Sequence, residues 1–421
     1  MRKLGESGTT NVPSPEVLSA LRRCAIDEPL FPNLEAIRLW NVAGGFIPFI
    51  PLFLSPGTVT ISIKAIENLP TIVASMITTI PTLCPNLRDI SLDNLPGNPI
   101  ISAAVSRMIL ASNRNTLRSL HVASPLTEEA CEVVHKLPDL RELWVAIGRD
   151  VSLPPLVLPS LTRLVIIHEQ NGDWMRMFHG ATLGKLQVVT FFFDSGQIDG
   201  CLEAFERLAL PASAHDTLSD FYFHTTWSWN PNYSSLLPFT QLTSLLIEFS
   251  CNDGCSSSVN DGVITNLARA MPKLERLQLG QAPCQTPSGA TVKGLATLAH
   301  YCLRLSILRI HFQAASLDPL AIPGVASGGE PTTPRENCAL ADLEVGGIPV
   351  PEGSALMIAL TLLRIFPRID NIWHFGGGWG KVADSISRSK RLADVSSMKP
   401  SLYPEVNLMT PPPGPALESA I

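Results

Sequence analysis

A hydrophobic triplet with the spacing L-x-x-L-x-L recurs thirteen times between Leu34 and Ile372. Most copies follow a stretch in which apolar residues have helical spacing, and many follow a Pro or a Cys. Twelve intervals over the 335 residues from Leu34 to Ile369 give about 28 residues per unit. Self-similarity at such a period indicates a fold built from stacked units rather than from separate compact cores. The first residues of the thirteen copies are Leu34, Thr58, Leu87, Leu117, Leu140, Leu161, Leu186, Leu218, Leu242, Leu274, Leu305, Leu340 and Ile369.

The segments between the triplets predict helices. Thr127 can cap a helix with Glu128 and Glu129 in its first turn, and Asn260 can cap another. Strands that alternate with helices favour an α/β fold with parallel strands. We therefore expect a leucine-rich-repeat solenoid of about 13 irregular repeats, with strands on the concave face and helices on the convex face. The expected helical segments are 72–83, 100–111, 127–134, 202–208, 260–271, 292–302 and 355–366.

Composition divides the chain into three parts. Residues 1–14 precede the repeats and are expected to be disordered. Residues 15–390 are expected to form the solenoid, with a mobile Gly/Pro/Thr-rich insertion at 324–336. Residues 391–421 are polar and Pro-rich, and are expected to form a disordered tail.

Charge and cysteine content narrow the classes of partner. The 421 residues carry a net charge of -6, which disfavours nucleic acid and anionic membranes as partners. No signal peptide is visible, and the most apolar run, Phe46 to Leu54, is too short to span a bilayer. Nine scattered cysteines are typical of reduced thiols. We expect a chain of the cytoplasm or nucleus that is monomeric and needs no cofactor.

Two strings carry a family resemblance: CPNLRDISL at Cys84 to Leu92 and FPNLEAIRL at Phe31 to Leu39. Together with the repeats from 15 to 390, they resemble the leucine-rich-repeat region of fungal F-box proteins. The resemblance implies that the repeats capture a protein substrate while an N-terminal F-box docks on the adaptor subunit of a cullin-type ubiquitin ligase. An F-box opens with a Leu-Pro pair and contains short helices, and no such pattern is visible before Leu34.

The alternation of side chains along a strand predicts where a partner would bind. If Ile37 and Leu39 face the core, then Trp40 lies on the concave surface. The same register exposes an apolar patch in the middle of the sheet, and such a patch is typical of an interaction site. The predicted partner-binding residues are Trp40, Trp144, Val165, Ile167, Phe192, Tyr222, His224 and Leu246.

Two alternatives stay open for this patch. The segment Thr225 to Phe239, which contains Trp227 and Trp229, could fold over it, as could the Pro-rich tail. An error in the assumed register would instead turn these side chains toward the core.

Two motif-like sequences resemble ligand sites only weakly. The glycine-rich string Phe375 to Val382 lacks the first Gly and the Ser or Thr of a phosphate loop, so we expect a terminal turn. Cys251 and Cys255 have no second pair or His at zinc-ligand spacing, so we expect free thiols. Cys84, which precedes an anchor Leu, is expected to be a small buried hydrophobe, as are Cys302 and Cys338.

Catalysis has little support in the sequence. His224 beside Asp220, or His121 near Ser119, could suggest a triad, but the G-x-S-x-G elbow is absent. We therefore expect a non-enzymatic protein-binding scaffold. The alternatives are an interaction protein without a ligase link, and an enzyme or GTPase-activating repeat protein.

Overall fold

The described strands form one parallel sheet. The computed structural model describes residues 3–5, 14–24, 29–42, 45–65, 70–93, 98–112, 116–148, 154–168, 177–178, 180–193, 212–225, 232–249, 259–280, 288–313, 338–345, 349–374 and 378–397. Within these ranges, fourteen strands lie side by side in chain order. The strands are β1 (Lys3–Gly5), β2 (Ala36–Val42), β3 (Thr60–Ala65), β4 (Asp89–Asp93), β5 (Ser119–Pro125), β6 (Glu142–Ile147), β7 (Arg163–His168), β8 (Val188–Phe193), β9 (Asp220–Thr225), β10 (Ser244–Phe249), β11 (Arg276–Leu279), β12 (Ile307–Ile310), β13 (Asp342–Val345) and β14 (Asn371–His374).

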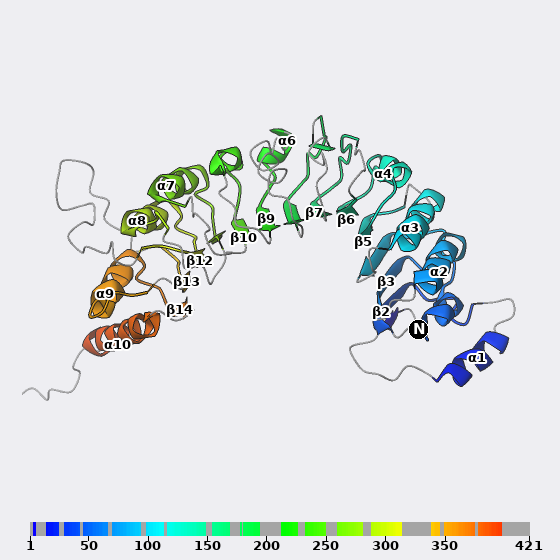
Figure 1. Ribbon diagram of the computed structural model, residues 1–421, viewed down its shortest axis with the longest axis horizontal. Helices are drawn as coiled ribbons and strands as arrows, with labels where there is room; N and C mark the ends of the chain where they lie inside the picture. Colours follow the sequence, from blue (N-terminus) through cyan, green and yellow to red (C-terminus); the bar gives the residue numbers. More distant parts are fainter. Residues whose placement is uncertain are drawn as a thin grey trace, which may run out of the picture.

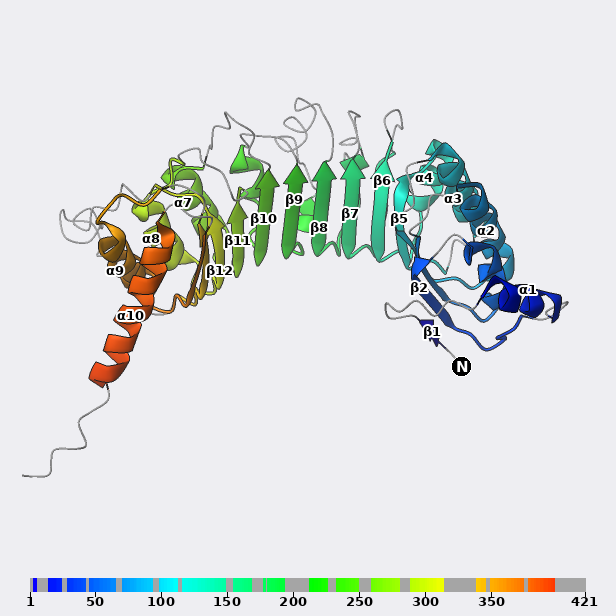
Figure 2. The same ribbon diagram turned by 60° about the horizontal axis from the view of Figure 1, so that its bottom comes forward.

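Helices cover the outer side of this sheet. Figure 1 shows an arch in which the strands line the inner side and the helices the outer side, and Figure 2 shows the strands standing parallel along the sheet. The α/β prediction is confirmed, and the arrangement is compatible with a solenoid. The helices are α1 (Pro15–Cys24), η1 (Ile47–Phe53), α2 (Pro70–Leu83), α3 (Pro99–Ala111), α4 (Glu128–Val134), α6 (Ala212–His215), η3 (Tyr233–Leu236), α7 (Asp261–Ala270), α8 (Val292–Tyr301), α9 (Ala355–Ile365) and α10 (Trp379–Ser397).

Each of the thirteen sequence copies contributes one strand, from β2 to β14. A repeated backbone contact fixes the register of neighbouring strands. The carbonyl of Glu35, just before β2, accepts from the N–H groups of Val59 and Thr60 at 2.8 and 3.1 Å. The same pair of bonds recurs at every junction as far as β14, so each strand starts in the same register as the strand before it. The other accepting carbonyls belong to Val59, Arg88, Arg118, Arg141, Thr162, Gln187, Ser219, Thr243, Glu275, Ser306 and Ala341. Among the described strands, the register shifts only near the ends of two strand pairs, between Trp40 and Val42 of β2 and between Val122 and Pro125 of β5.

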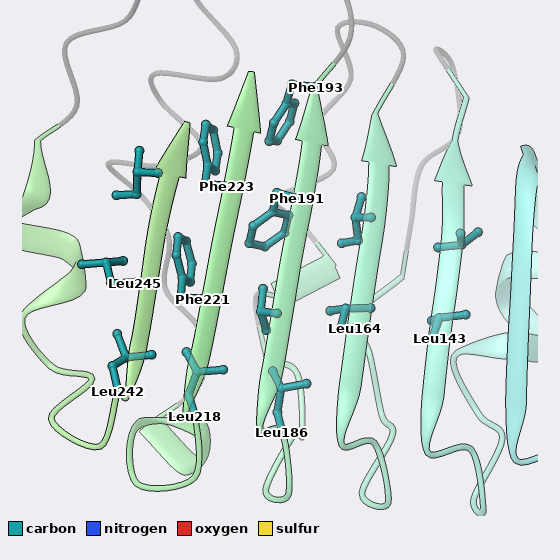
Figure 3. Packing of buried hydrophobic residues seen from close by; sticks show 14 of the residues in the cluster. Leu143, Leu164, Leu186, Phe191, Phe193, Leu218, Phe221, Phe223, Leu242 and Leu245 are labelled. Atoms are coloured by element: carbon teal, nitrogen blue, oxygen red, sulfur yellow. The ribbon is translucent and has the colours of Figure 1, made fainter. Parts of the chain in front are cut away.

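The core lies between the sheet and the helices. All thirteen first residues of the triplets are buried, including Thr58, whose hydroxyl donates to the carbonyl of Leu34 at 2.9 Å. In the middle of the sheet, Phe191 packs at 6.0 Å between ring centroids against both Phe178 and Phe221. Figure 3 shows Phe191 and Phe193 of β8 beside the phenylalanines of β9, with rows of leucines on neighbouring strands. Stacked rows of this kind make one continuous apolar core along the chain.

Two boundaries differ from the sequence prediction. Lys3–Gly5 lies in the segment expected to be disordered, yet it forms β1 and pairs with β2. The backbone hydrogen bonds offered by the free edge of β2 explain this pairing. At the other end, α10 continues to Ser397, beyond the expected start of the tail at 391. The insertion 324–336, the helix expected at 202–208 and the tail beyond Ser397 lie outside the described residues. Among the described helices, none is long and apolar enough to cross a bilayer.

A glycine allows α7 and α8 to approach closely. A Cβ at Gly294 would stand 2.6 Å from Oδ1 of Asp261 and 2.9 Å from Cδ1 of Ile264. The same carboxylate accepts from the backbone N–H of Thr291 at 2.7 Å and of Gly294 at 3.1 Å. A larger residue at 294 would push the two helices apart. It would also weaken the two hydrogen bonds by which Asp261 accepts from the N-terminus of α8.

Gly294→Ala is therefore expected to destabilise the chain by about 1 to 2 kcal/mol, although alanine is the better helix former. Urea unfolding monitored by circular dichroism measures the change. Gly184→Ala is the control, because a Cβ at Gly184 meets nothing within 4 Å. Equal effects of the two substitutions would contradict the close approach.

Candidate functional site: the concave face of the sheet

The strand register places the predicted site residues in rows on the concave face. Trp40 lies on β2, Trp144 on β6, Val165 and Ile167 on β7, Phe192 on β8, Tyr222 and His224 on β9, and Leu246 on β10. One row across β6 to β10 consists of Trp144, Val165, Thr190, Tyr222 and Leu246. A second row across β7 to β9 consists of Ile167, Phe192 and His224. Seven of the eight residues are thus brought together, on five adjacent strands.

Trp40 does not join this group. It lies on β2 and is 56% exposed, whereas the group begins at β6. Its register neighbour on β3 is Lys64, which is followed on β4 by Asp93. The order of the repeats already implies this separation, because the copy that begins at Leu34 precedes the copy that begins at Leu140 by four repeats.

Aromatic rings make continuous contact along the middle of the face. The His121 and Trp144 centroids are 5.7 Å apart, and the Trp144 ring stacks on Phe192 at 6.4 Å. Phe192 in turn contacts Tyr222 at 5.4 Å and His224 at 6.0 Å. We call these five residues the aromatic row. Offset and edge-to-face contacts at such distances stabilise the rings in fixed positions.

The aromatic row changes the accessibility of one predicted residue. Trp144 stands on β6 and Phe192 on β8, so their stacked rings meet across the intervening strand β7. They cover Val165, which is only 2% exposed. The expectation that Val165 offers an accessible surface is therefore wrong, because larger neighbours bury it.

A carboxylate stands at each end of the aromatic row. Glu248 accepts hydrogen bonds from the Tyr222 hydroxyl at 2.5 Å and from Nδ1 of His224 at 3.2 Å. At the other end, Glu142 accepts from the Ser119 hydroxyl at 3.3 Å and lies 3.3 Å from Nε2 of His121. The predicted site residues did not include either glutamate, although the outward register of β6 and β10 places both on the concave face. Glu248 follows Leu246 in the outward register of β10, and this was the signal that could have found it.

The contacts of Glu248 shift two pKa values. The hydrogen bond from His224 is the largest cause that lowers the pKa of Glu248, and the Tyr222 hydroxyl adds to it against the effect of burial. Burial and the neighbouring carboxylate raise the pKa of Tyr222. The carboxylate is thus held charged and the phenol neutral, so the phenol stays a hydrogen-bond donor.

The lowered pKa of Glu248 predicts a pH-dependent stability. A carboxyl with a lower pKa in the folded chain stabilises the fold above its unfolded pKa of about 4.3, and this contribution is lost as the pH falls through the folded pKa. We expect wild type to be more stable than Glu248→Gln at pH about 6, and the difference to shrink toward pH about 3. Chemical denaturation of both proteins at several pH values measures it. Glu352→Gln, on an exposed turn, is the control. A difference that stays constant with pH would contradict the assignment.

The side chains considered for a triad have other partners. Asp220 pairs with Arg276 at 2.9 Å, while His224 contacts Glu248. Ser119 and His121 share Glu142 as their acceptor. A catalytic nucleophile needs a hydrogen bond to its general base. Ser119 and His121 are both bonded to Glu142 and not to each other, and the partner of His224 is Glu248 and not Asp220.

The remaining predictions concern cysteines and the glycine-rich string. Cys84, Cys302 and Cys338 are buried as expected, and burial raises the pKa of Cys84 to about 11 and that of Cys302 to about 12. Cys251 and Cys255 lie outside the described residues, as do Trp227, Trp229 and the start of the glycine-rich string. Within the ranges that are described, no group of three His, Cys, Asp or Glu residues could hold a metal ion.

The described part of the segment that could cover the patch lies elsewhere. The residues of η3 belong to it, and there Tyr233 and Leu236 are buried in the core. Phe239 is also buried in the core and contacts His215 of α6. This part of the segment therefore packs into the core instead of over the aromatic row.

No family model matches this chain, and no curated protein matches it. The geometry of the concave face is therefore the basis for a functional argument.

Proposed function

We propose that the chain is a leucine-rich-repeat solenoid that binds a protein partner on its concave face and catalyses no reaction. The observation that carries this proposal is the aromatic row, which spans β5 to β9 at the centre of the face. Trp and Tyr are the residues most enriched at binding hot spots. They provide a large contact area with little loss of conformational freedom.

The indole of Trp144 gives independent support. Its Nε1 is buried and has no hydrogen-bond partner among the described residues. A buried donor without a partner costs about 1 to 3 kcal/mol, so Phe at this position would fold at least as well. The presence of Trp therefore favours a role other than stability. Contact with a partner is such a role.

The resemblance to fungal F-box proteins suggests that the partner is a substrate of a ubiquitin ligase. We propose that the repeats act as the substrate-recognition part of an F-box subunit in a cullin-type ubiquitin ligase, in the cytoplasm or nucleus. In this role the concave face holds the substrate, and the ligase adaptor binds elsewhere. An interaction protein without a ligase link would use the same face and would recover no adaptor.

Site-specific photo-cross-linking tests the proposal. Benzoylphenylalanine replaces Arg163, an exposed residue on the concave side of β7, in the full chain expressed in cells. The control carries it at Ile100, which is 49% exposed on α3 on the convex side. We expect a covalent protein adduct from position 163 that is absent from position 100. Adducts of equal yield at both positions, or at 100 alone, would contradict a concave binding face.

The same preparations test the ligase link. A tag on the chain should recover the adaptor subunit from cells whichever position carries the cross-linker. Recovery of the concave adduct without the adaptor would support the alternative, an interaction protein outside the ligase.

A further inference from the structure

A groove lies at the C-terminal end of the concave face, several strands from the aromatic row. It has a volume of about 520 Å³ and is formed by side chains of β12, β13 and β14. Its lining residues are Ile307, Arg309, Asp342, Glu344, Trp373 and His374. In the strand register Glu344 is the direct neighbour of Trp373, and Asp342 is the neighbour of Asn371. The groove therefore combines an indole with two carboxylates from the adjacent strand.

Trp373 is unusually open for an aromatic residue. It is 62% exposed, and among the described residues only Trp40 is a comparably exposed aromatic, at 56%. Both stand on the concave face, near opposite ends of the sheet. Their surroundings differ in charge, because Trp40 has the cationic Lys64 as its register neighbour whereas Trp373 has the anionic Glu344. Trp40 is therefore a matched reference for the environment of Trp373.

The charges in the groove leave one carboxylate without a cation. Glu344 forms an ion pair with Arg309 at 2.8 Å. Asp342 accepts only a neutral hydrogen bond, from the Asn371 side chain at 2.8 Å, and within the described part of the chain it has no ion pair. With one arginine against two carboxylates, the lining has a formal charge of −1 when His374 is neutral.

The Trp373 ring is also open to a cation. Among the described residues, the one cation over an aromatic ring is Arg269, which lies over Tyr301. Trp is the best aromatic acceptor for a cation, and a desolvated contact of this type is stronger than an exposed one. An exposed indole that lines the same groove as an unpaired carboxylate thus matches a group that is both cationic and partly apolar.

We propose that this groove binds a lysine or arginine side chain of the protein partner, with the cation over Trp373 and beside Asp342. The aliphatic stem of such a side chain can lie along Ile307, while its charged head reaches the carboxylate. The inference rests on the proposed function in that it assigns a chemistry to the partner of the concave face. It identifies that partner as one that presents an exposed lysine or arginine side chain.

Fluorine NMR on the full chain tests the groove directly. All seven tryptophans are labelled as 5-fluorotryptophan, and Trp373→Phe and Trp40→Phe assign the two resonances of interest. The probes are the blocked tripeptides acetyl-Gly-Arg-Gly-amide and acetyl-Gly-Lys-Gly-amide, with acetyl-Gly-Glu-Gly-amide as the anionic control. We expect both cationic probes to shift the Trp373 resonance saturably, and the Trp40 resonance to stay in place. The anionic probe should shift neither.

Asp342→Asn then tests the carboxylate. Asp342 is half-buried, and the amide oxygen of Asn can still accept the hydrogen bond from the Asn371 side chain, so the fold should be kept. We expect the cationic probes to bind about three- to tenfold more weakly to this variant, because one nearby opposite charge is removed. Circular dichroism confirms the fold of the variant. The inference is overturned if the cationic probes leave Trp373 unshifted, if they shift Trp40 equally, or if Asp342→Asn binds them as well as wild type.

Failure here is distinguishable from failure of the proposed function. A concave photo-adduct together with an unresponsive Trp373 would keep the function and remove the groove. A responsive Trp373 without any concave adduct would keep the groove as a cation site and remove the function.

Discussion

Replacing Phe191 with alanine is expected to lower the free energy of unfolding by about 3 to 5 kcal/mol, the range for a large aromatic in a tight core. Phe191 is fully buried. Its ring lies within 6.3 Å, between centroids, of Phe193 and Phe223, in addition to its contacts with Phe178 and Phe221. Such a cluster cannot collapse to fill the space, so a cavity remains where the ring was.

The neighbouring residue provides the matched control. Phe192 is the same residue type on the same strand, but its side chain points to the concave face. Phe192→Ala should cost about 1 kcal/mol, because it loses ring contacts without opening a core cavity. Denaturation followed by circular dichroism on both variants gives the comparison. A larger loss for Phe192→Ala would mean that the assignment of inward and outward faces is reversed.

The same reasoning applies to the aliphatic core. Leu143→Ala and Leu277→Ala should each cost about 2 to 5 kcal/mol, because both leucines are at most 2% exposed. In a solenoid each unit contacts only its neighbours, so the loss of local stability should be largest in the adjacent strands. Hydrogen exchange measured along the chain would show that distribution.

Trp144→Ala is expected to weaken binding of the concave partner at least about 30-fold, which corresponds to about 2 kcal/mol at a hot spot. Trp144 lies inside the aromatic row, between His121 and Phe192, where its indole offers the largest ring of the row to a partner. Removal of its ring would also free Phe192 on one side and His121 on the other. The effect on folding should be small by comparison. Titration of the purified chain with the partner found by cross-linking measures the affinity.

Trp40→Ala is the control for this substitution. It removes the same residue type from the same face, but at a position outside the aromatic row. We expect it to change the affinity less than threefold, as do most residues outside a hot spot. If Trp40→Ala weakens binding more than Trp144→Ala does, the centre of the face is not the binding site.

The repeat pattern predicted the fold in considerable detail. The L-x-x-L-x-L spacing placed thirteen strands correctly, because a residue type that must be buried every few positions leaves a periodic trace in the sequence. It also predicted most of the helices that cover the outer side, from caps such as Asn260 and from helical spacing. Local rules suffice for these features because every unit in a solenoid packs on its neighbours in sequence.

The contacts within the site could not be predicted from the sequence pattern, because they join side chains on different strands. The alternation of side chains gave the correct face for seven clustered residues, but it could not show that two rings from β6 and β8 meet over Val165 and bury it. Nor could it show that Glu248 accepts from both Tyr222 and His224. These contacts join residues that are more than twenty positions apart, and their geometry depends on side-chain size and strand spacing together.

The sequence by itself determined that this chain stacks repeated units into a parallel sheet, and which side chains turn toward the core. The tertiary structure alone decided which outward side chains stay accessible, which charges are paired, and where an indole such as Trp373 lines the same groove as an unpaired carboxylate. The physical reason is that burial of a strand face follows from periodicity along the chain. Accessibility and charge pairing instead depend on side chains of neighbouring strands, and the periodic pattern of the sequence does not specify how these side chains contact one another.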